Sequence, residues 1–260
     1  MADSRQGDPH YCLSGCSVHR QVHNYYSYLS SYLCLSLSST QSTFLPLASV
    51  CLREGASVLV HGTEGTDSTL QVTSLAQIIL DPACRTIQGF QALVEREWLQ
   101  AGHPFQQRCS QSAYNNSKPR CEAPVFLLFL DCVWQILRQF PCSFQFSQHF
   151  LVLLFEHAYA SQFGTFVGNS ASERSKLNLS QKTVSLWSWV NRPQEVERLS
   201  NPLYEANCLV IWPSVAPQSL LLWEGKNLAP FLTPDPKCSA HSQVSVQFSG
   251  DSRVEFRVDT

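Results

Sequence analysis

The sequence predicts an α/β fold in which one strand and a tight loop precede a mainly helical half. Residues 56–60 are apolar on both faces, which is typical of a strand in the centre of a sheet. A loop rich in glycine and threonine follows, and a helix begins after it. Strand, loop and helix N-terminus in this order form the layout of a phosphate-binding loop. Farther along, apolar residues recur at helical spacing, which indicates the helical half.

Four helices are predicted after the loop, each with an apolar face and a stop signal. The first ends at Asp81-Pro82, the second spans 86–101 and stops at Gly102, the third spans 125–139 before Pro141, and Ser147 is the expected N-cap of the fourth. The residues expected to face the core are Val72, Leu75, Ala76, Ile79, Leu80, Phe90, Leu93, Val94, Trp98, Phe150, Leu151, Leu154, Phe155 and Ala158. We interpret these side chains, and Cys132 in the third helix, as core packing.

The loop is the candidate site, and its residues are His61, Gly62, Thr63, Glu64, Gly65, Thr66, Asp67 and Ser68. A loop of this shape normally holds an oxyanion through backbone N–H groups and a helix N-terminus. Its acidic side chains, Glu64 and Asp67, would instead repel a phosphate. The sequence therefore predicts the shape of a phosphate site without its chemistry.

The missing chemistry is that of cysteine-dependent phosphatases, which need the spacing Cys-x-x-x-x-x-Arg. A thiolate at the helix N-terminus attacks phosphorus, and a planar guanidinium clamps the equatorial oxygens. Gly62 and Ser68 stand at this spacing. Glycine offers no nucleophile, and a serine hydroxyl brings no charge to stabilise the transition state.

The loop resembles that of the myotubularin family, whose active members read His-Cys-Ser-Asp-Gly-Trp-Asp-Arg-Thr here. The matching residues are His61, Gly65, Asp67 and Thr69, and the departures are Gly62, Thr63, Glu64, Thr66 and Ser68. Further family motifs follow in order: RTIQGF at 85–90, EWLQAGHPF at 97–105, FLLFLDCVWQ at 126–135, FGTF at 163–166, SLWSWVN at 185–191 and WEG at 223–225. So many long motifs in one order make a specific match over roughly residues 54–225.

The resemblance implies the fold of the protein-tyrosine-phosphatase superfamily, with a central strand and phosphate loop before a mainly helical C-terminal half. Relatives carry a PH-GRAM domain and the first half of the phosphatase domain before this loop, and a coiled coil after it. We therefore expect a non-family, low-complexity arm at 1–51, the C-terminal part of a phosphatase-like domain at 52–225, and a non-family tail at 226–260. A truncated or alternatively spliced product, or an imperfect gene model, is the expectation for this organisation.

The resemblance also implies a function, that of a catalytically inactive regulatory subunit or adaptor. Its partners would be active myotubularin-related phosphatases, those usually numbered six, seven and eight, which act on 3-phosphorylated inositol lipids. The expected location is the cytoplasm, with association with endosomal or other internal membranes. Asp67 matches the family's general acid, and His61 is expected to bond loop backbone rather than act as a base. No catalytic residue, cofactor or metal is expected.

Three alternatives remain open. The first is a phosphoinositide-binding scaffold, with Lys118, Arg120 and Arg174 as a basic rim. The second is an active phosphatase that uses Asp67 as nucleophile, which would require a metal to neutralise the phosphate. The third is an inert truncated product, since a strand without its neighbours exposes an unpaired edge and favours aggregation.

Composition excludes several other classes of protein. A net charge of −2 predicts no strong attraction to nucleic acid or anionic membrane. Eleven cysteines without a secretory signal peptide are interpreted as reduced intracellular thiols. The frequent serines in the uncharged run 24–52 argue against a membrane span.

Histidines elsewhere suggest no site. The cluster His10, Cys12, Cys16, His19 and His23 lacks the interval of about twelve residues that a Cys2His2 zinc finger requires, so we favour scattered polar residues in a disordered arm. His103 and His157 have no cysteine or acid partner at a diagnostic spacing. They are expected to be surface or satisfied core histidines.

Overall fold

The computed structural model describes residues 58–109, 123–221, 223, 244–248 and 254–258. The expected arm at 1–51, the cysteine and histidine cluster within it, and the uncharged run at 24–52 lie outside these residues. None of the helices in the described ranges is long and apolar enough to cross a bilayer.

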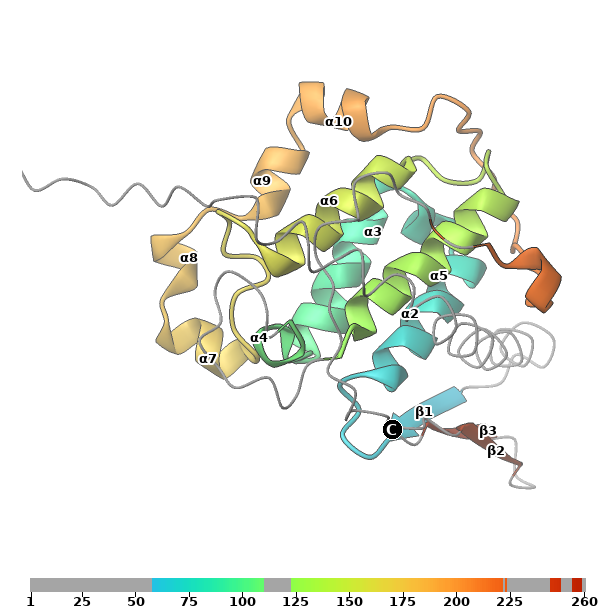
Figure 1. Cartoon of the computed structure of the whole chain (residues 1–260), viewed down its shortest axis with the longest axis horizontal. Coiled ribbons are helices and arrows are strands. Elements are labelled where there is room, and N and C mark those ends of the chain that lie inside the picture. The colour runs from blue at the N-terminus through green and yellow to red at the C-terminus, as the bar shows by residue number, and fades with distance from the viewer. Residues whose placement is uncertain (1–57, 110–122, 222, 224–243, 249–253, 259–260) are drawn as a thin grey trace, which may run out of the picture.

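A helical body carries a small sheet at one end (Figure 1). The elements in chain order are β1 (Val58–Gly62), α2 (Ser68–Leu80), η1 (Pro82–Arg85), α3 (Ile87–Val94), η2 (Glu95–Gln100), α4 (Phe105–Arg108), α5 (Val125–Gln139), α6 (Gln148–Tyr159), α7 (Ala171–Lys176), α8 (Leu179–Lys182), α9 (Leu186–Val190), α10 (Pro193–Leu199), η4 (Pro217–Ser219), β2 (Val244–Phe248) and β3 (Val254–Val258). The domain is largely helical, as the apolar periodicity predicts.

The sheet has the strand order β1-β3-β2. β1 runs parallel to β3, with Val60 opposite Phe256, and β2 runs antiparallel to β3. β1 is therefore an edge strand among the described strands, and Leu59 is 61% exposed on it. The prediction of a central strand is not confirmed, because among the described strands β3 pairs with one side of β1 and none pairs with the other.

The predicted helices agree with the structure at most of their ends. α5 occupies 125–139 as predicted, and α2 ends at Leu80, where Asp81 extends the chain. Ser147 is the N-cap residue of α6, although its side chain makes no capping hydrogen bond. The stop signals determine these ends because they act on neighbouring residues of the same helix.

The second predicted helix contains a feature that its sequence pattern does not show. α3 continues into η2, a π-helical segment, before the chain turns at Gly102 with φ of 87°. The wider turn lets the backbone N–H of His103 bond the carbonyl of Trp98 at 2.9 Å. Insertions of this kind shift the register of the side chains beyond them, so η2 sets the direction in which His103 leaves the helix.

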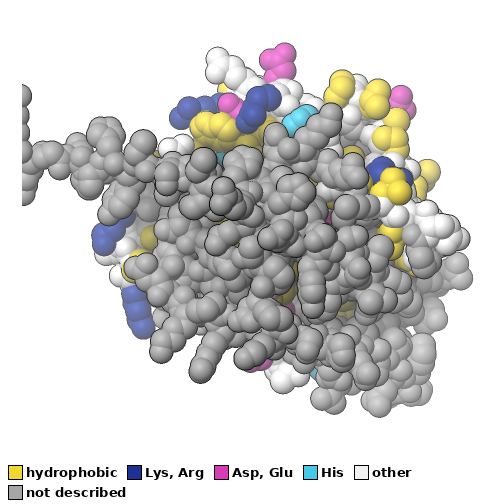
Figure 2. All heavy atoms as spheres, in the orientation of Figure 1, with side chains coloured by type: hydrophobic (Ala, Val, Ile, Leu, Met, Phe, Trp, Pro, Cys, Tyr) yellow, Lys and Arg dark blue, Asp and Glu magenta, His cyan; other side chains and the backbone are white. Residues whose placement is uncertain are grey.

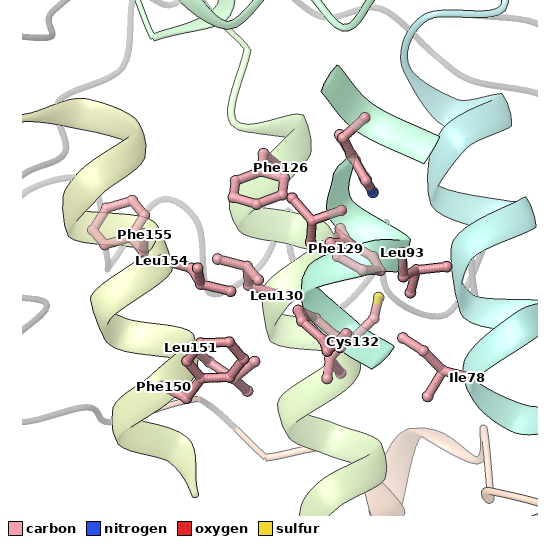
Figure 3. Close-up of a cluster of buried hydrophobic side chains, with 14 of the residues drawn as sticks. Ile78, Leu93, Phe126, Phe129, Leu130, Cys132, Phe150, Leu151, Leu154 and Phe155 are labelled. Carbon is pink, nitrogen blue, oxygen red and sulfur yellow. The ribbon is translucent and has the colours of Figure 1, made fainter. Parts of the chain in front are cut away.

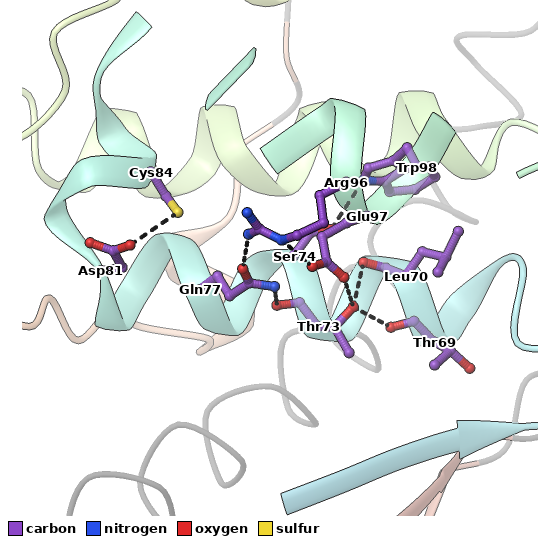
Figure 4. Close-up of polar contacts among 10 residues, drawn as sticks. All are labelled: Thr69, Leu70, Thr73, Ser74, Gln77, Asp81, Cys84, Arg96, Glu97 and Trp98. Atoms are coloured by element: carbon purple, nitrogen blue, oxygen red, sulfur yellow. Dashed lines mark hydrogen bonds and ion pairs between the residues drawn. The ribbon is translucent and has the colours of Figure 1, made fainter. Parts of the chain in front are cut away.

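η2 and α2 are joined by polar side chains as well as by packing (Figure 4). The buried indole of Trp98 donates to the hydroxyl of Ser74 at 3.0 Å. Nearer the surface, Arg96 donates to Gln77, and the hydroxyl of Thr73 lies 3.4 Å from a carboxylate oxygen of Glu97. A buried indole N–H usually needs such a partner, so Ser74 stabilises Trp98 in the core.

The core lies where α5 packs between α2 and α6, with α3 against it (Figures 1 and 3). Phe90 is fully buried and contacts three phenylalanines, with ring centroids 4.9 Å from Phe146 and 5.9 Å from both Phe129 and Phe150. Aromatic pairs of this geometry contribute about 0.5–1.5 kcal/mol each beyond the area they bury. The core predictions for these helices are confirmed at Val72, Leu75, Ala76, Ile79, Phe90, Leu93, Val94, Trp98, Cys132, Phe150, Leu151, Leu154, Phe155 and Ala158.

The surface shows both basic and apolar side chains outside this core (Figure 2). Lys176 and Lys182 are exposed on α7 and α8. Leu203, Leu209 and Trp212 are 61%, 73% and 43% exposed along the extended chain after α10. Single exposed apolar residues are common on protein surfaces, and we assign no role to these three.

Candidate functional site

The candidate loop joins β1 to α2 and places its residues as the sequence order predicts. Gly62 is the last residue of β1, and Ser68 is the first residue of α2. Between them Gly65 turns the chain with φ of 72°, a left-handed conformation that glycine adopts without strain. The two positions at phosphatase spacing therefore lie at the two ends of a tight loop.

Asp67 begins α2 through its backbone and not through its side chain. Its carbonyl accepts hydrogen bonds from the N–H groups of Leu70 at 3.0 Å and Gln71 at 3.2 Å. The carboxylate makes no capping bond. An aspartate at this position commonly caps the helix with its side chain, so a stronger partner has drawn this carboxylate away.

That partner is Arg108, at the end of α4. Its Nε donates to Oδ1 of Asp67 at 3.2 Å, and its Nη2 donates to Oδ2, so the guanidinium holds both carboxylate oxygens. The two side chains are only 18% and 11% exposed. A paired geometry of this kind is the strong form of an arginine–carboxylate interaction.

His103 completes the contacts of the loop. Its Nδ1 lies 2.8 Å from the carbonyl oxygen of Thr66 and 3.2 Å from Oδ1 of Asp67. Because a carbonyl oxygen can only accept, Nδ1 must carry the hydrogen and donate it. His103 thus binds the loop backbone and the Asp67 carboxylate with one N–H group.

The surroundings of His103 fix the orientation of its ring. The residue is 2% exposed, and its ring meets Trp98 and Phe105 edge to face, with centroids 5.0 and 4.7 Å away. Its Nε2 is buried without a hydrogen-bond partner among the described residues. The aromatic contacts therefore position the ring, and only Nδ1 reaches polar groups.

These contacts decide the charge of Asp67. Burial by itself raises the pKa of this carboxyl, but hydrogen bonds and positive charge from His103 and Arg108 outweigh burial and lower the pKa below its ordinary value. Asp67 is therefore ionised near neutral pH, and both of its oxygens are bonded. A carboxylate in this state has no proton to give as a general acid.

The histidine predictions need correction. His61 is exposed and makes no hydrogen bond to the loop within the described part of the chain, whereas His103 bonds the loop backbone. His103 is a buried core histidine, one of the two settings expected for it, and its acid partner in the fold is Asp67, which does not lie at a diagnostic sequence spacing. The short spacing rules that reveal metal and catalytic pairs cannot detect it, since α2, α3 and η2 lie between the two residues.

The ring nitrogens of His157 make fewer hydrogen bonds than predicted for a satisfied core histidine. Its ring packs edge to face with Phe163 and Trp189, at 5.3 and 6.2 Å between centroids. Its Nδ1 is buried without a partner among the described residues, and burial lowers its pKa. We interpret His157 as a neutral packing residue at the edge of the core.

Of the predicted basic rim only Arg174 lies within the described residues. Its Nη1 donates to the carbonyls of Thr165 at 2.5 Å and Val167 at 2.8 Å, so it holds the chain before α7. It also lines a cavity of about 490 Å³, whose other lining residues are Glu95, Gly164, Thr165, Ser175, Leu179, Ser180, Thr183 and Ser185. Lys118 and Arg120 lie outside the described residues.

The strand, loop and helix, with Gly62 and Ser68 at phosphatase spacing, define a phosphatase-like domain. Residues 16–175 match the family model described as the myotubularin-like phosphatase domain. The chain therefore belongs to the myotubularin family. The matched range begins within the segment 1–51 that we placed outside the family, and the domain boundaries stay a prediction.

Individual relatives agree with this assignment. The chain is 79% identical over 180 residues to myotubularin-related protein 9 of Mus musculus and 77% identical to that of Homo sapiens, in each case over 69% of this chain and 33% of the relative. It is 47% identical over 170 residues to the phosphatidylinositol-3,5-bisphosphate 3-phosphatase MTMR2 of Mus musculus, over 65% of this chain and 26% of the relative. The chain thus spans about a third or less of the length of these relatives.

Proposed function

We propose that this chain is a non-catalytic phosphatase-like protein that binds active myotubularin-related phosphatases and modulates their action on 3-phosphorylated phosphoinositides. The observation that carries the proposal is the pairing of Asp67 with Arg108 in a loop that begins at Gly62 and ends before Ser68. A cysteine-dependent phosphatase needs a nucleophile, an oxygen clamp and a proton donor. In this loop Gly62 supplies no nucleophile, Ser68 supplies no clamp, and the ionised Asp67 supplies no proton.

Gly62 has no side chain with which to attack phosphorus, and the hydroxyl of Ser68 cannot replace a bidentate guanidinium. Asp67 occupies the position of the family's acid, but it is held as a carboxylate by Arg108 and His103. The neighbouring Glu64 is exposed and acidic, which disfavours a phosphate at the loop.

The same contacts argue against Asp67 as a nucleophile. An aspartyl-phosphate enzyme keeps one carboxylate oxygen available to attack phosphorus, and a metal neutralises the phosphate. Here Arg108 covers both oxygens, and His103 adds a further donor to Oδ1. Attack would require breaking this partly buried ion pair, which is costly.

A regulatory role is supported by family membership together with a loop that keeps its tight turn but lacks the catalytic groups. MTMR2, a relative at 47% identity, is named as a phosphatase of phosphatidylinositol 3,5-bisphosphate, so the family includes enzymes of this lipid class. The proposed partners are active relatives, those usually numbered six, seven and eight. The proposed location is the cytoplasm and the endosomal or other internal membranes where such lipids occur.

The phosphoinositide-binding alternative gains little from Arg174. One of its nitrogens already donates to two backbone carbonyls. Glu95, on the wall of the same cavity, adds negative charge that opposes an anionic headgroup. We therefore retain modulation of an active relative as the proposed function.

The test measures phosphate release from phosphatidylinositol 3-phosphate by a purified active relative, with and without this chain. We expect the rate of the relative to change with added chain and to saturate, while the chain alone releases nothing. The full-length inactive relative serves as the positive control for modulation. A rate that stays constant while that control works would contradict the proposal, and release by the chain alone would show that it is an enzyme.

A further inference from the structure

The cavity that Arg174 lines lies on the side of the helical body that carries α7 and α8 (Figure 1). Its volume of about 490 Å³ falls within the range of about 300–1,000 Å³ that small-molecule sites occupy. Its walls come from η2, the chain before α7, α7 itself, and the chain from α8 to the start of α9. η2 is a π-helical segment, and such segments occur frequently at functional sites. No lining residue belongs to the candidate loop, so the cavity is a separate feature of the fold.

Hydrogen bonds tie the walls of the cavity to one another. The N–H of Gly164 donates to the carbonyl of Val184 at 3.1 Å. The N–H of Leu186 donates to the hydroxyl of Thr165 at 2.8 Å. Gly164 permits this close approach of the two walls, because a Cβ atom there would lie 1.9 Å from the hydroxyl oxygen of Thr183. The cavity is therefore preformed, as small-molecule sites usually are.

The lining contains one negative and one positive side chain, and each keeps atoms available to a ligand. Oε1 of Glu95 accepts from the indole N–H of Trp187 at 2.5 Å, whereas Oε2 has no hydrogen-bond partner among the described residues. Nη1 of Arg174 donates to two backbone carbonyls, whereas its Nε and Nη2 have no partner in the described part of the chain. Burial lowers the pKa of Arg174, and the charge of Glu95 opposes this shift, so the two side chains interact. Their charges cancel, which favours a neutral ligand.

Hydroxyl groups dominate the rest of the lining, and they belong to Thr165, Ser175, Ser180, Thr183 and Ser185. The hydroxyls of Ser175 and Ser180 make no hydrogen bond to other described residues, so both can donate to a ligand and accept from it. Leu179 is the one large apolar side chain in the lining that the structure describes. A ligand that fits here must offer donors and acceptors over most of its surface, because a polar group left unpaired on binding costs affinity.

We propose that this cavity binds a small neutral polyol, linear or cyclic, of the size of a hexose. Hydroxyls of the polyol donate to Oε2 of Glu95 and accept from Nε and Nη2 of Arg174, and others pair with the free serine hydroxyls. A phosphorylated polyol would be repelled by Glu95, and an amino polyol would be repelled by Arg174. An amino acid could pair with both charges, but it has too few hydrogen-bonding groups to match the hydroxyls of the lining.

The experiment measures ligand binding to the full chain by saturation-transfer difference NMR. D-glucose and D-sorbitol are the neutral ligands, and each is compared with its own 6-phosphate and with its amine, glucosamine or glucamine. L-alanine represents the amino acids. We expect at least one of the two polyols to bind saturably and at least about tenfold more tightly than its charged counterparts and than L-alanine, because only the neutral ligand satisfies both charged side chains without repulsion.

Two phenylalanine variants test whether the polyol lies in the cavity. Ser175→Phe fills the cavity from α7, and Ser172→Phe changes an exposed serine of the same helix that is outside the lining. We expect Ser175→Phe to weaken polyol binding at least about tenfold, and Ser172→Phe to change it by less than about threefold. Circular dichroism checks that each variant keeps the helical content of the unchanged chain. If Ser175→Phe unfolds the protein, Ser180→Phe replaces it, since Ser180 is also exposed and lines the cavity from α8.

Glu95→Gln tests the origin of the selectivity. The variant removes the negative charge and keeps an oxygen that accepts from the indole of Trp187. It should bind the 6-phosphate at least about tenfold better, relative to the polyol, than the unchanged chain does. The proposal is overturned if neither polyol binds saturably to the folded chain up to about 50 mM. It is also overturned if the folded cavity-filling variant binds the polyol unchanged, or if a charged ligand or L-alanine binds the unchanged chain as tightly as the polyol.

Discussion

Arg108 holds both carboxylate oxygens of Asp67 across a sequence separation of 41 residues. This single pair fixes the end of the candidate loop to α4. It also keeps Asp67, which stands at the position of the family's general acid, in its ionised form. The phosphatase-like loop is thus held in shape by contacts that withdraw its carboxylate from chemistry.

Replacing Asp67 with asparagine should destabilise the domain. The change leaves the partly buried guanidinium of Arg108 without its counter-charge, and breaking such a pair costs about 3 kcal/mol. Urea unfolding of the variant and the unchanged chain at pH 7 measures the difference. The matched control is Glu64→Gln, an exposed acid of the same loop, which should change stability by less than about 0.5 kcal/mol. Equal effects from the two substitutions would contradict a stabilising role for the pair.

Asp131 should make stability depend on pH below neutrality. Burial raises its pKa from 3.8 to about 7, although a hydrogen bond from Gln135 opposes this. The folded chain then keeps a proton that the unfolded chain has lost, so the free energy of unfolding falls by about 1.4 kcal/mol per pH unit between about pH 4 and pH 7. Above a pH of about 7, Asp131 is ionised in both the folded and the unfolded chain, and the free energy of unfolding falls no further through this group.

The variant Asp131→Asn isolates this effect, because asparagine cannot ionise. Thermal unfolding should show that the stability of Asp131→Asn relative to the unchanged chain is about 3 kcal/mol greater at pH 8 than at pH 5. The comparison at pH 5 is the internal control for packing. A stability difference that is the same at both values would mean that ionisation of Asp131 plays no part.

Gly89 should not tolerate a side chain. A Cβ atom there would lie 1.8 Å from the carbonyl oxygen of Ala83 and 2.6 Å from its carbon. That carbonyl also accepts from the N–H and hydroxyl of Thr86, so it cannot easily move. Gly89→Ala should cost about 3 kcal/mol, measured by urea unfolding. The exposed neighbour Gln88, changed to alanine, should cost less than about 0.5 kcal/mol.

Restoring both missing groups is a direct test of the loop. We expect Gly62→Cys with Ser68→Arg to release detectable phosphate from phosphatidylinositol 3-phosphate, and each single change to release none, because thiolate and guanidinium are needed together. Activity should stay well below that of an active relative, since Arg108 keeps Asp67 ionised. A silent double variant, with the fold confirmed by circular dichroism, would show that the loop no longer has the geometry of the enzymes.

Much of the fold follows from local sequence signals. The bounds of α5 and the end of α2 were predictable because apolar periodicity and stop residues act within one helix. The position of β1 in its sheet was not, because it depends on which distant strand pairs with it. η2 was also missed, since a π-helical segment contains the same apolar pattern as the helix that it interrupts.

For the candidate site, too, some features follow from local sequence and others only from tertiary contacts. The sequence by itself determined the family resemblance, the positions of Gly62 and Ser68, and hence the missing nucleophile and clamp, because these depend on which residues stand in one short loop. Only the tertiary structure decided the state of Asp67, and it assigned to His103 the loop contact expected of His61. The reason is physical, since the charge of a carboxyl group depends on its burial and on the hydrogen-bond donors and cations beside it, and here folding brings His103 and the Arg108 guanidinium from the distant segment around α4.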